Sequence, residues 1–232
     1  ILHNGLLQRT FRIVPDVACT DFKNLSNGQQ LLRAVSPEAR LVIDGKTYQV
    51  GGLKGQTEKA YLRPEWVDDF TALATDFKLT GVESEPLQPF LNWQPKTWVA
   101  NPNQPSGQTL VFTYEAVAPE IAGLEVRIFY ELYDGLPLLV KWLSVENRGP
   151  KPVKLNQVVN EILAVVEEES AVVGKPAQMK KQHGLYVETN FAFNNAMRYD
   201  ISDQTTHWKT DSSYTSQVNY NYETPCVLEI YP

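Results

Sequence analysis

The amino-acid sequence predicts an all-β protein, a large antiparallel β-sandwich of two stacked sheets with one short helix. Three observations support this fold class. Apolar and polar residues alternate along most segments, as they do in strands with one buried face. Turn signals such as Asp44-Gly45 and Asp134-Gly135 separate these segments. The strands do not alternate with helices in the βαβ pattern, which excludes doubly wound and barrel enzymes.

In the first quarter of the chain, alternation predicts several strands. They cover residues 5–14, 17–25 and 38–50, and the last segment folds back on itself at Asp44-Gly45. Asp-Gly between two alternating runs is a strong short-range signal for a hairpin. A glycine-rich run at residues 51–55 then interrupts the sheet.

The one segment that predicts a helix covers residues 64–72. Trp66, Phe70 and Leu73 recur at spacings of four and three residues, which is the helical period. Pro64 suits the first turn of a helix, where its missing N–H group costs nothing. We expect Trp66 to lie on the buried face of this helix.

The strand pattern resumes in the second half. Residues 109–115 predict a strand, and residues 124–132 with 138–145 predict a central hairpin. The second arm of this hairpin is apolar enough to be covered on both faces, so we expect Trp142 in the core. Residues 154–166 predict one further long strand.

Composition restricts the classes of function. The chain has 232 residues with 21 Lys and Arg against 27 Asp and Glu, and the basic residues are scattered. Neutralising nucleic-acid phosphates needs a clustered basic surface, so we expect no nucleic-acid partner. No apolar run approaches the length of a membrane span. The three His and two Cys lack the spacing of zinc ligands, and we expect neither metal nor cofactor.

The two cysteines, Cys19 and Cys226, lie near opposite ends of the chain. Two interpretations stay open. Free cysteine is among the most buried residue types, so both can be buried thiols. A disulfide between the first and last strand regions is the alternative, and two cysteines do not decide between them.

Several separated motifs carry a family resemblance. They are NGLLQRTF at residues 4–11, RAVSPEA at 33–39, DGKTYQVGGL at 44–53, YELYDGLP at 130–137, Lys141-Trp142, Glu146-Asn147 and residues 188–191. In this order they resemble the N-terminal domain of bacterial melibiase-type glycoside hydrolases, the α-galactosidase-like proteins. The resemblance covers most of the chain, and none of these motifs is a catalytic signature.

The resemblance implies that residues 1–232 form a single β-supersandwich domain, related to galactose mutarotase, that precedes a (β/α)-barrel. In that family the barrel supplies the two catalytic carboxylates. Since a barrel needs roughly two hundred further residues, we expect a non-catalytic N-terminal fragment of a larger glycoside hydrolase. Its expected partners are its own catalytic domain, a second copy in a homo-oligomer, and galactosides or oligosaccharides.

Candidate sugar-binding residues come from the chemistry of pyranoses, whose apolar faces stack on aromatic rings while amides and carboxylates bind the hydroxyl groups. Residues 83–107 are proline-rich and predict a long loop, which we expect to face the catalytic domain or a neighbouring subunit. The candidates in this loop and near the end of the chain are Phe90, Trp93, Trp98, Asp203, His207, Trp208 and Asp211. The same rings serve equally to pack a loop or an interdomain contact, and we favour that interpretation. No catalytic residue is assigned.

Two rival functions remain. An independent carbohydrate-binding module would bind sugar through Trp93 and Trp98. An aldose 1-epimerase would need a general acid and base, with His183 or His207 as the only realistic histidines. A shared fold does not confer that activity. The acidic composition, rich in Tyr and Asn, is compatible with a periplasmic or secreted enzyme.

Overall fold

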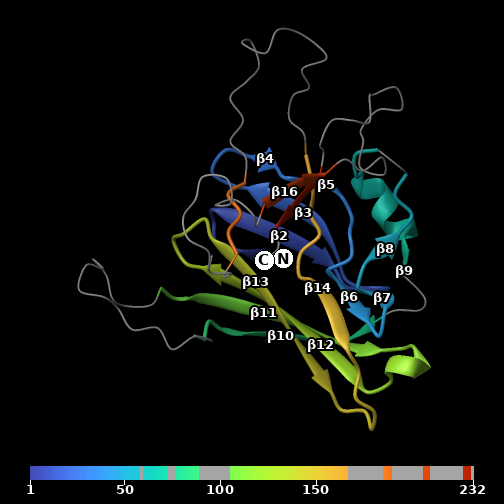
Figure 1. Cartoon of the computed structure of the whole chain (residues 1–232). Helices are drawn as coiled ribbons and strands as arrows, with labels where there is room; N and C mark the ends of the chain where they lie inside the picture. Colours follow the sequence, from blue (N-terminus) through green and yellow to red (C-terminus); the bar gives the residue numbers. More distant parts are fainter. Residues whose placement is uncertain are drawn as a thin grey trace. The chain divides into compact units, whose positions relative to one another are not determined.

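The computed structural model of the chain (Figure 1) describes residues 1–57, 60–72, 77–88, 105–166, 185–189, 206–209 and 227–230. The chain divides into two compact units. The first comprises Ile1–Gln56 and Tyr61–Val166, and the second comprises Thr57–Ala60 and Glu167–Pro232. The expectation of a single domain over the whole chain stays a prediction.

The first unit is an all-β sandwich, as the sequence predicts, and its smaller layer is a sheet with the order β1-β2-β3-β4. Neighbouring strands in this sheet are antiparallel. Their bounds are β1 Leu2–His3, β2 Leu7–Arg12, β3 Ala18–Asn24 and β4 Gln29–Gln30.

The larger layer is a seven-stranded sheet with the order β13-β12-β11-β10-β7-β6-β14. All its neighbours are antiparallel except β10 and β7, which pair in parallel at Phe77 and Val50. The bounds are β6 Ala39–Ile43, β7 Lys46–Val50, β10 Phe77–Pro86, β11 Gly107–Ala116, β12 Leu124–Tyr133, β13 Leu139–Asn147 and β14 Leu155–Val159.

Three two-stranded ribbons complete the strands of the described residues. In the first unit β5 pairs with β15, and β8 pairs with β9; in the second unit β16 pairs with β17. The bounds are β5 Leu32–Ala34, β15 Ala164–Val165, β8 Leu53–Lys54, β9 Thr71–Ala72, β16 Thr206–Lys209 and β17 Val227–Ile230.

The main hydrophobic core lies between the two sheets of the first unit, and β12 shows how alternation builds it. Val126, Ile128 and Tyr130 are fully buried on its inner face. From the four-stranded sheet, the Phe11 ring lies 5.1 Å from the ring of Phe112 and 4.9 Å from that of Tyr130. These edge-on and tilted contacts join the two layers and add to the area that the rings bury.

The predicted Asp44-Gly45 hairpin is confirmed. Ile43 and Lys46 pair directly across the turn, so the loop has two residues. Asp44 has φ 49° and Gly45 has φ 81°, and two left-handed residues in succession are what a type I′ turn requires. The chemistry of the turn thus sets the register of β6 against β7.

The predicted helix is shorter and tighter than the sequence suggests. Pro64–Asp69 forms a 3-10 helix, η1, and a second one, η2, covers Pro119–Ile121. At Phe70 the backbone is already extended, and Thr71–Ala72 is strand β9 instead of the last turn of a helix. Trp66 packs, partly buried, against a small cluster with Phe70, which agrees with its expected position.

Two further expectations need correction. Trp142 lies outside the main core: it stacks on Phe129, with ring centroids 3.7 Å apart, on the face of β12 opposite to Ile128 and Tyr130. The cause is the pleat, since successive side chains point to opposite faces. The long strand expected over residues 154–166 is divided into β14 and β15 by residues 160–163.

Candidate functional site

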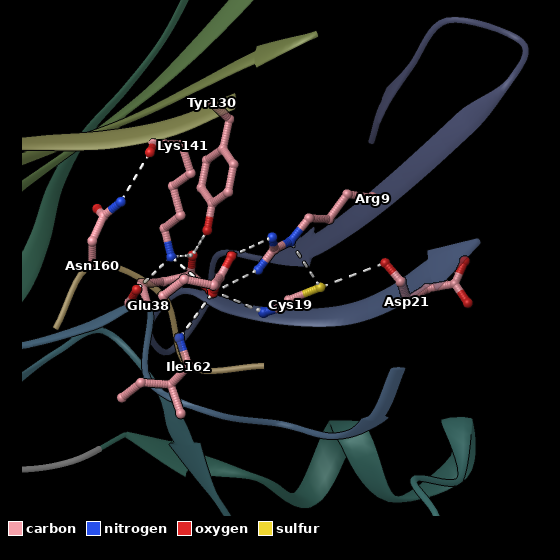
Figure 2. Close-up of polar contacts among 9 residues, drawn as sticks. Arg9, Cys19, Asp21, Glu38, Tyr130, Lys141, Asn160 and Ile162 are labelled. Atoms are coloured by element: carbon pink, nitrogen blue, oxygen red, sulfur yellow. Dashed lines mark hydrogen bonds and ion pairs between the residues drawn. The ribbon is translucent and has the colours of Figure 1, made fainter. Parts of the chain in front are cut away.

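The most elaborate polar arrangement in the described part of the first unit lies between the two sheets. We call it the bridging cluster, and its members are Arg9, Cys19, Glu38, Tyr130, Lys141 and Glu161. Figure 2 shows Arg9 and Cys19 on the strands of the four-stranded sheet, facing Tyr130 and Lys141 from the seven-stranded sheet.

Arg9, on β2 of the four-stranded sheet, supplies the first cation of the cluster. Its Nη1 donates to Glu161 Oε2 at 2.7 Å, and its Nη2 donates to Oε1 at 3.3 Å. Its Nε donates to the Cys19 sulfur at 3.3 Å. Arg9 is only 4% exposed, and the faces of Phe22 and Tyr130 lie 5.4 Å and 4.8 Å from its guanidinium carbon. The paired carboxylate and the aromatic faces together offset the cost of burying this cation.

Lys141, on β13, supplies the second cation. Its Nζ lies 3.0 Å from Glu161 Oε1 and 3.8 Å from Glu38 Oε2, and it also donates to the backbone carbonyl of Glu38. The Lys141 side chain is 6% exposed. The single carboxylate of Glu161 therefore pairs with both cations, and the Glu161 side chain is 33% exposed.

Glu38 joins the cluster from the residue before β6. Its Oε2 accepts a hydrogen bond from the Tyr130 hydroxyl, and its Oε1 accepts one from the backbone N–H of Cys19 at 3.2 Å. Its own N–H donates to the carbonyl of Val50 at 2.9 Å. A buried carboxylate must be hydrogen-bonded or paired, and Glu38 meets this requirement from both sheets.

The electrostatics of the cluster favour the ionised form of the Glu161 carboxyl group. Burial raises the pKa of this carboxyl group, but the positive charges of Arg9 and Lys141 outweigh burial and lower the pKa to about 2. Burial likewise lowers the pKa of Arg9, yet Glu161 and its other neighbours raise it well above the ordinary value. At neutral pH the Arg9–Glu161 contact is therefore a full ion pair.

Two further members, Cys19 and Tyr130, are held protonated. Burial raises the pKa of the Cys19 thiol to about 11, against the opposing effect of Arg9. Burial also raises the pKa of Tyr130 well above its ordinary value, although Arg9 acts in the other direction. A buried thiol with a raised pKa is a poor nucleophile. Chemically, the cluster can join the two sheets through its hydrogen bonds and ion pairs, and its two cations can bind a carboxylate.

None of these residues is among the candidate sugar-binding residues, although part of the signal for the cluster is visible in the sequence. Arg9 lies on the same face of its predicted strand as Leu7 and Phe11, and Lys141 interrupts an apolar run. A charged residue on a buried face needs a partner of opposite charge. The sequence does not show that Glu161 is this partner, because 152 residues separate it from Arg9.

The predicted sugar-binding residues fall almost wholly beyond the part of the chain that the structure describes. Phe90, Trp93, Trp98, Asp203 and Asp211 lie outside the described residues, as does His183. His207 and Trp208 belong to β16, where they pair with Glu229 and Leu228 of β17. The sugar-binding site therefore stays a prediction.

The predicted proline-rich loop begins later than expected. Residues 83–86 belong to β10, which pairs with β11 as far as Pro86 and Gln108, and β11 begins at Gly107. A proline is tolerated where a strand ends, because little pairing follows it. Residues 89–104, which contain the aromatic candidates of this loop, lie outside the described residues.

Cys19 is a buried free thiol, and Cys226 lies outside the described residues. Within the described ranges, no three His, Cys, Asp or Glu side chains gather as a group that could hold a metal ion. None of the helices among these residues is long and apolar enough to cross a membrane. Comparison of the chain with models of protein families, with curated proteins and with solved structures found no match.

Proposed function

We propose that this chain is the non-catalytic β-sandwich module of an α-galactosidase-like glycoside hydrolase, and that it packs against the catalytic barrel of that enzyme. The proposal rests on the sequence resemblance together with one structural observation. Four of the motifs that carry the resemblance, at residues 4–11, 33–39, 130–137 and 141–142, supply residues to one cluster in the fold.

The bridging cluster contains one residue from each of four of these motifs. Arg9 comes from residues 4–11, Glu38 from residues 33–39, Tyr130 from residues 130–137, and Lys141 from the pair Lys141-Trp142. Tyr130 and Lys141 both donate directly to Glu38, and Arg9 joins Lys141 through the carboxylate of Glu161. A fold shared with the α-galactosidase-like family would explain why residues from separated motifs meet inside the sandwich.

A second contact joins the first and fourth motifs. The Asn4 side-chain amide donates to the backbone carbonyl of Tyr133 at 2.6 Å and to that of Leu136 at 2.7 Å. Its side-chain oxygen accepts from the N–H groups of Leu6 and Leu7, both at 2.9 Å. One asparagine thus fixes the entry of the chain against the central hairpin, which is again a structural role.

The chemistry of the cluster supports a module without its own catalytic pair. A retaining glycosidase needs one ionised carboxylate and one carboxylic acid whose pKa is raised. The pKa of Glu161 is instead lowered to about 2, and its carboxylate is occupied by Arg9 and Lys141. Glu38 is occupied by Tyr130 and the backbone of Cys19.

The proposal is tested by assaying the purified chain and the product of its complete reading frame on an aryl α-galactoside. We expect hydrolysis by the complete protein and none by the chain, with βα units encoded downstream. Hydrolysis by the chain alone would refute the proposal. A complete protein without a barrel or without activity would refute it equally.

Calorimetric titration of the chain with galactosides and oligosaccharides separates the module from its main rival. A packing module gives no heat of binding. Binding that is lost in Trp93→Ala and Trp98→Ala would identify a carbohydrate-binding module instead. Faster interconversion of sugar anomers, measured by polarimetry and abolished in His183→Ala or His207→Ala, would identify an epimerase.

A further inference from the structure

The segment between β14 and the end of the first unit is fastened to the sandwich at several points. We call residues 160–166 the strap. The Asn160 amide donates to the carbonyl of Lys141 at 2.9 Å, and the Val166 N–H donates to the carbonyl of Leu31 at 2.9 Å. Between them, Ala164 pairs with Ala34 in the β15–β5 ribbon. Glu161 is the charged contact of the strap with both sheets.

The groups around the Glu161 carboxylate are held in place by contacts that do not involve the strap. Arg9 is fixed by its bond to the Cys19 sulfur and by the rings of Phe22 and Tyr130. Lys141 is fixed by its bond to the carbonyl of Glu38. Both cations are therefore positioned by the sheets before the carboxylate arrives, which makes the site preorganised.

Charge balance shows that the site requires an anion. Without Glu161, the cluster holds the cations Arg9 and Lys141 against the single carboxylate of Glu38, which leaves one buried positive charge uncompensated. Glu161 marks the side of the site that faces solvent, because its side chain is 33% exposed while those of Arg9 and Lys141 are 4% and 6% exposed. A fork-shaped guanidinium with an ammonium beside it is chemistry that recognises a carboxylate.

We propose that Arg9 and Lys141 form a carboxylate receptor, that Glu161 is its internal ligand, and that this contact latches the strap onto the sandwich. The receptor accepts a small external carboxylate when the side chain of Glu161 is removed. This role goes beyond the proposed packing function, and its test does not depend on that function. The strap opens as a local unit when the latch is broken.

The test compares Glu161→Ala in acetate and in chloride at equal ionic strength, on the full chain. In chloride we expect Tm to fall by about 5 °C or more, because a buried pair has lost one partner. Hydrogen exchange at the Val166 amide should become at least about tenfold faster, while β11 and β12 stay protected. Acetate should restore much of both losses in Glu161→Ala and should change neither quantity in the wild type.

Two further variants separate a receptor from a general salt effect. Glu161→Gln fills the site with a neutral amide, so it should show the loss of Tm without rescue by acetate. Glu146→Ala removes an exposed carboxylate that pairs with Arg148 at 2.8 Å, and it should show neither the loss nor the rescue. Equal effects of acetate and chloride on Glu161→Ala, or an unchanged Val166 amide, would overturn the proposal. If Glu161→Ala does not fold in chloride, failure to refold in acetate would overturn it as well.

Discussion

Two of the arginine–carboxylate arrangements in the described part of the first unit are alike in chemistry and differ in the burial of the arginine. In the bridging cluster, Arg9 binds Glu161 through two N–H groups at 2.7 and 3.3 Å. In the second arrangement, which we call the surface triad, Arg148 binds Glu125 through two N–H groups at 2.6 and 3.0 Å and also binds Glu146 at 2.8 Å. The geometry of the surface triad is at least as good as that of the cluster.

The difference lies in the surroundings of the two cations. Arg9 is 4% exposed and is enclosed by aromatic rings, whereas the side chain of Arg148 is 56% exposed. The carboxylates do not follow this order: Glu125 is 10% exposed, Glu161 33% and Glu146 58%. Water and salt screen an exposed pair, so its contribution to stability is small. A buried pair costs more to desolvate, and losing one partner leaves a charge that nothing compensates. Hydrogen-bond distance alone therefore does not rank the two arrangements.

The largest effect is expected for Arg9→Met, which keeps much of the volume and removes the charge. Glu161 and the Cys19 sulfur lose their shared donor, so the free energy of unfolding should fall by about 3–5 kcal/mol. Urea unfolding followed by tryptophan fluorescence measures this change. A loss as small as that of Glu146→Gln would show that burial does not distinguish the two arrangements.

Acidification should weaken the cluster through Glu161. The pKa of this group is lowered from its ordinary 4.5 to about 2 in the folded chain, so its contribution is present above pH 4.5 and is lost as the pH falls toward 2. After allowance for its exposed third, the contribution is roughly 2 kcal/mol. Unfolding of the wild type and of Glu161→Gln across this range should show their difference shrinking as the pH falls. A constant difference would contradict the assignment.

A smaller effect is expected for Tyr130→Phe, which removes one hydroxyl group and keeps the ring. Glu38 loses the hydrogen bond to its Oε2 but keeps the one from the Cys19 N–H, so the cost should be about 1–2 kcal/mol. Chemical denaturation measures it. Tyr133→Phe is the matched control, because the Tyr133 hydroxyl donates to Glu131 at 2.9 Å in a hydrogen bond outside the cluster.

The smallest effect is expected for Glu146→Gln in the surface triad. Arg148 keeps both of its bonds to Glu125, and the lost partner is exposed. The pKa of Glu146 is lowered by its hydrogen bond to Arg148, yet screening by solvent keeps the effect on folding small. Tm from calorimetry should change by less than about 2 °C. A larger change would place surface pairs among the main stabilising contacts of this fold.

Much of the fold could be predicted because its signals are local. The strand β12 and the two-residue turn at Asp44-Gly45 are each indicated by neighbouring residues, and both are confirmed, although β12 is buried on both faces instead of one. The less successful predictions concern segments whose state depends on distant neighbours. The helix after Pro64 is a 3-10 turn, and the long strand over residues 154–166 is interrupted where Glu161 binds the cluster.

The bridging cluster shows the limit of local signals. Arg9 and Glu38 lie in two of the motifs that carry the family resemblance, but their importance comes from partners across the two sheets. Which carboxylate neutralises which cation depends on how the sheets stack, and many charge pairings are compatible with one pattern of alternation. The expectation that Trp142 lies in the core is wrong for a related reason: its strand is apolar on both faces, so its local pattern does not show which face the main core covers.

The amino-acid sequence alone determined the antiparallel strands and their turns, because backbone geometry and the alternation of apolar and polar side chains act between near neighbours. Stacking of the layers then brought Arg9, Lys141 and Glu161 to one buried point. That meeting depends on the contact of Arg9 with Glu161, which lies 152 positions away in the sequence, and the charges are desolvated only once the two sheets enclose them.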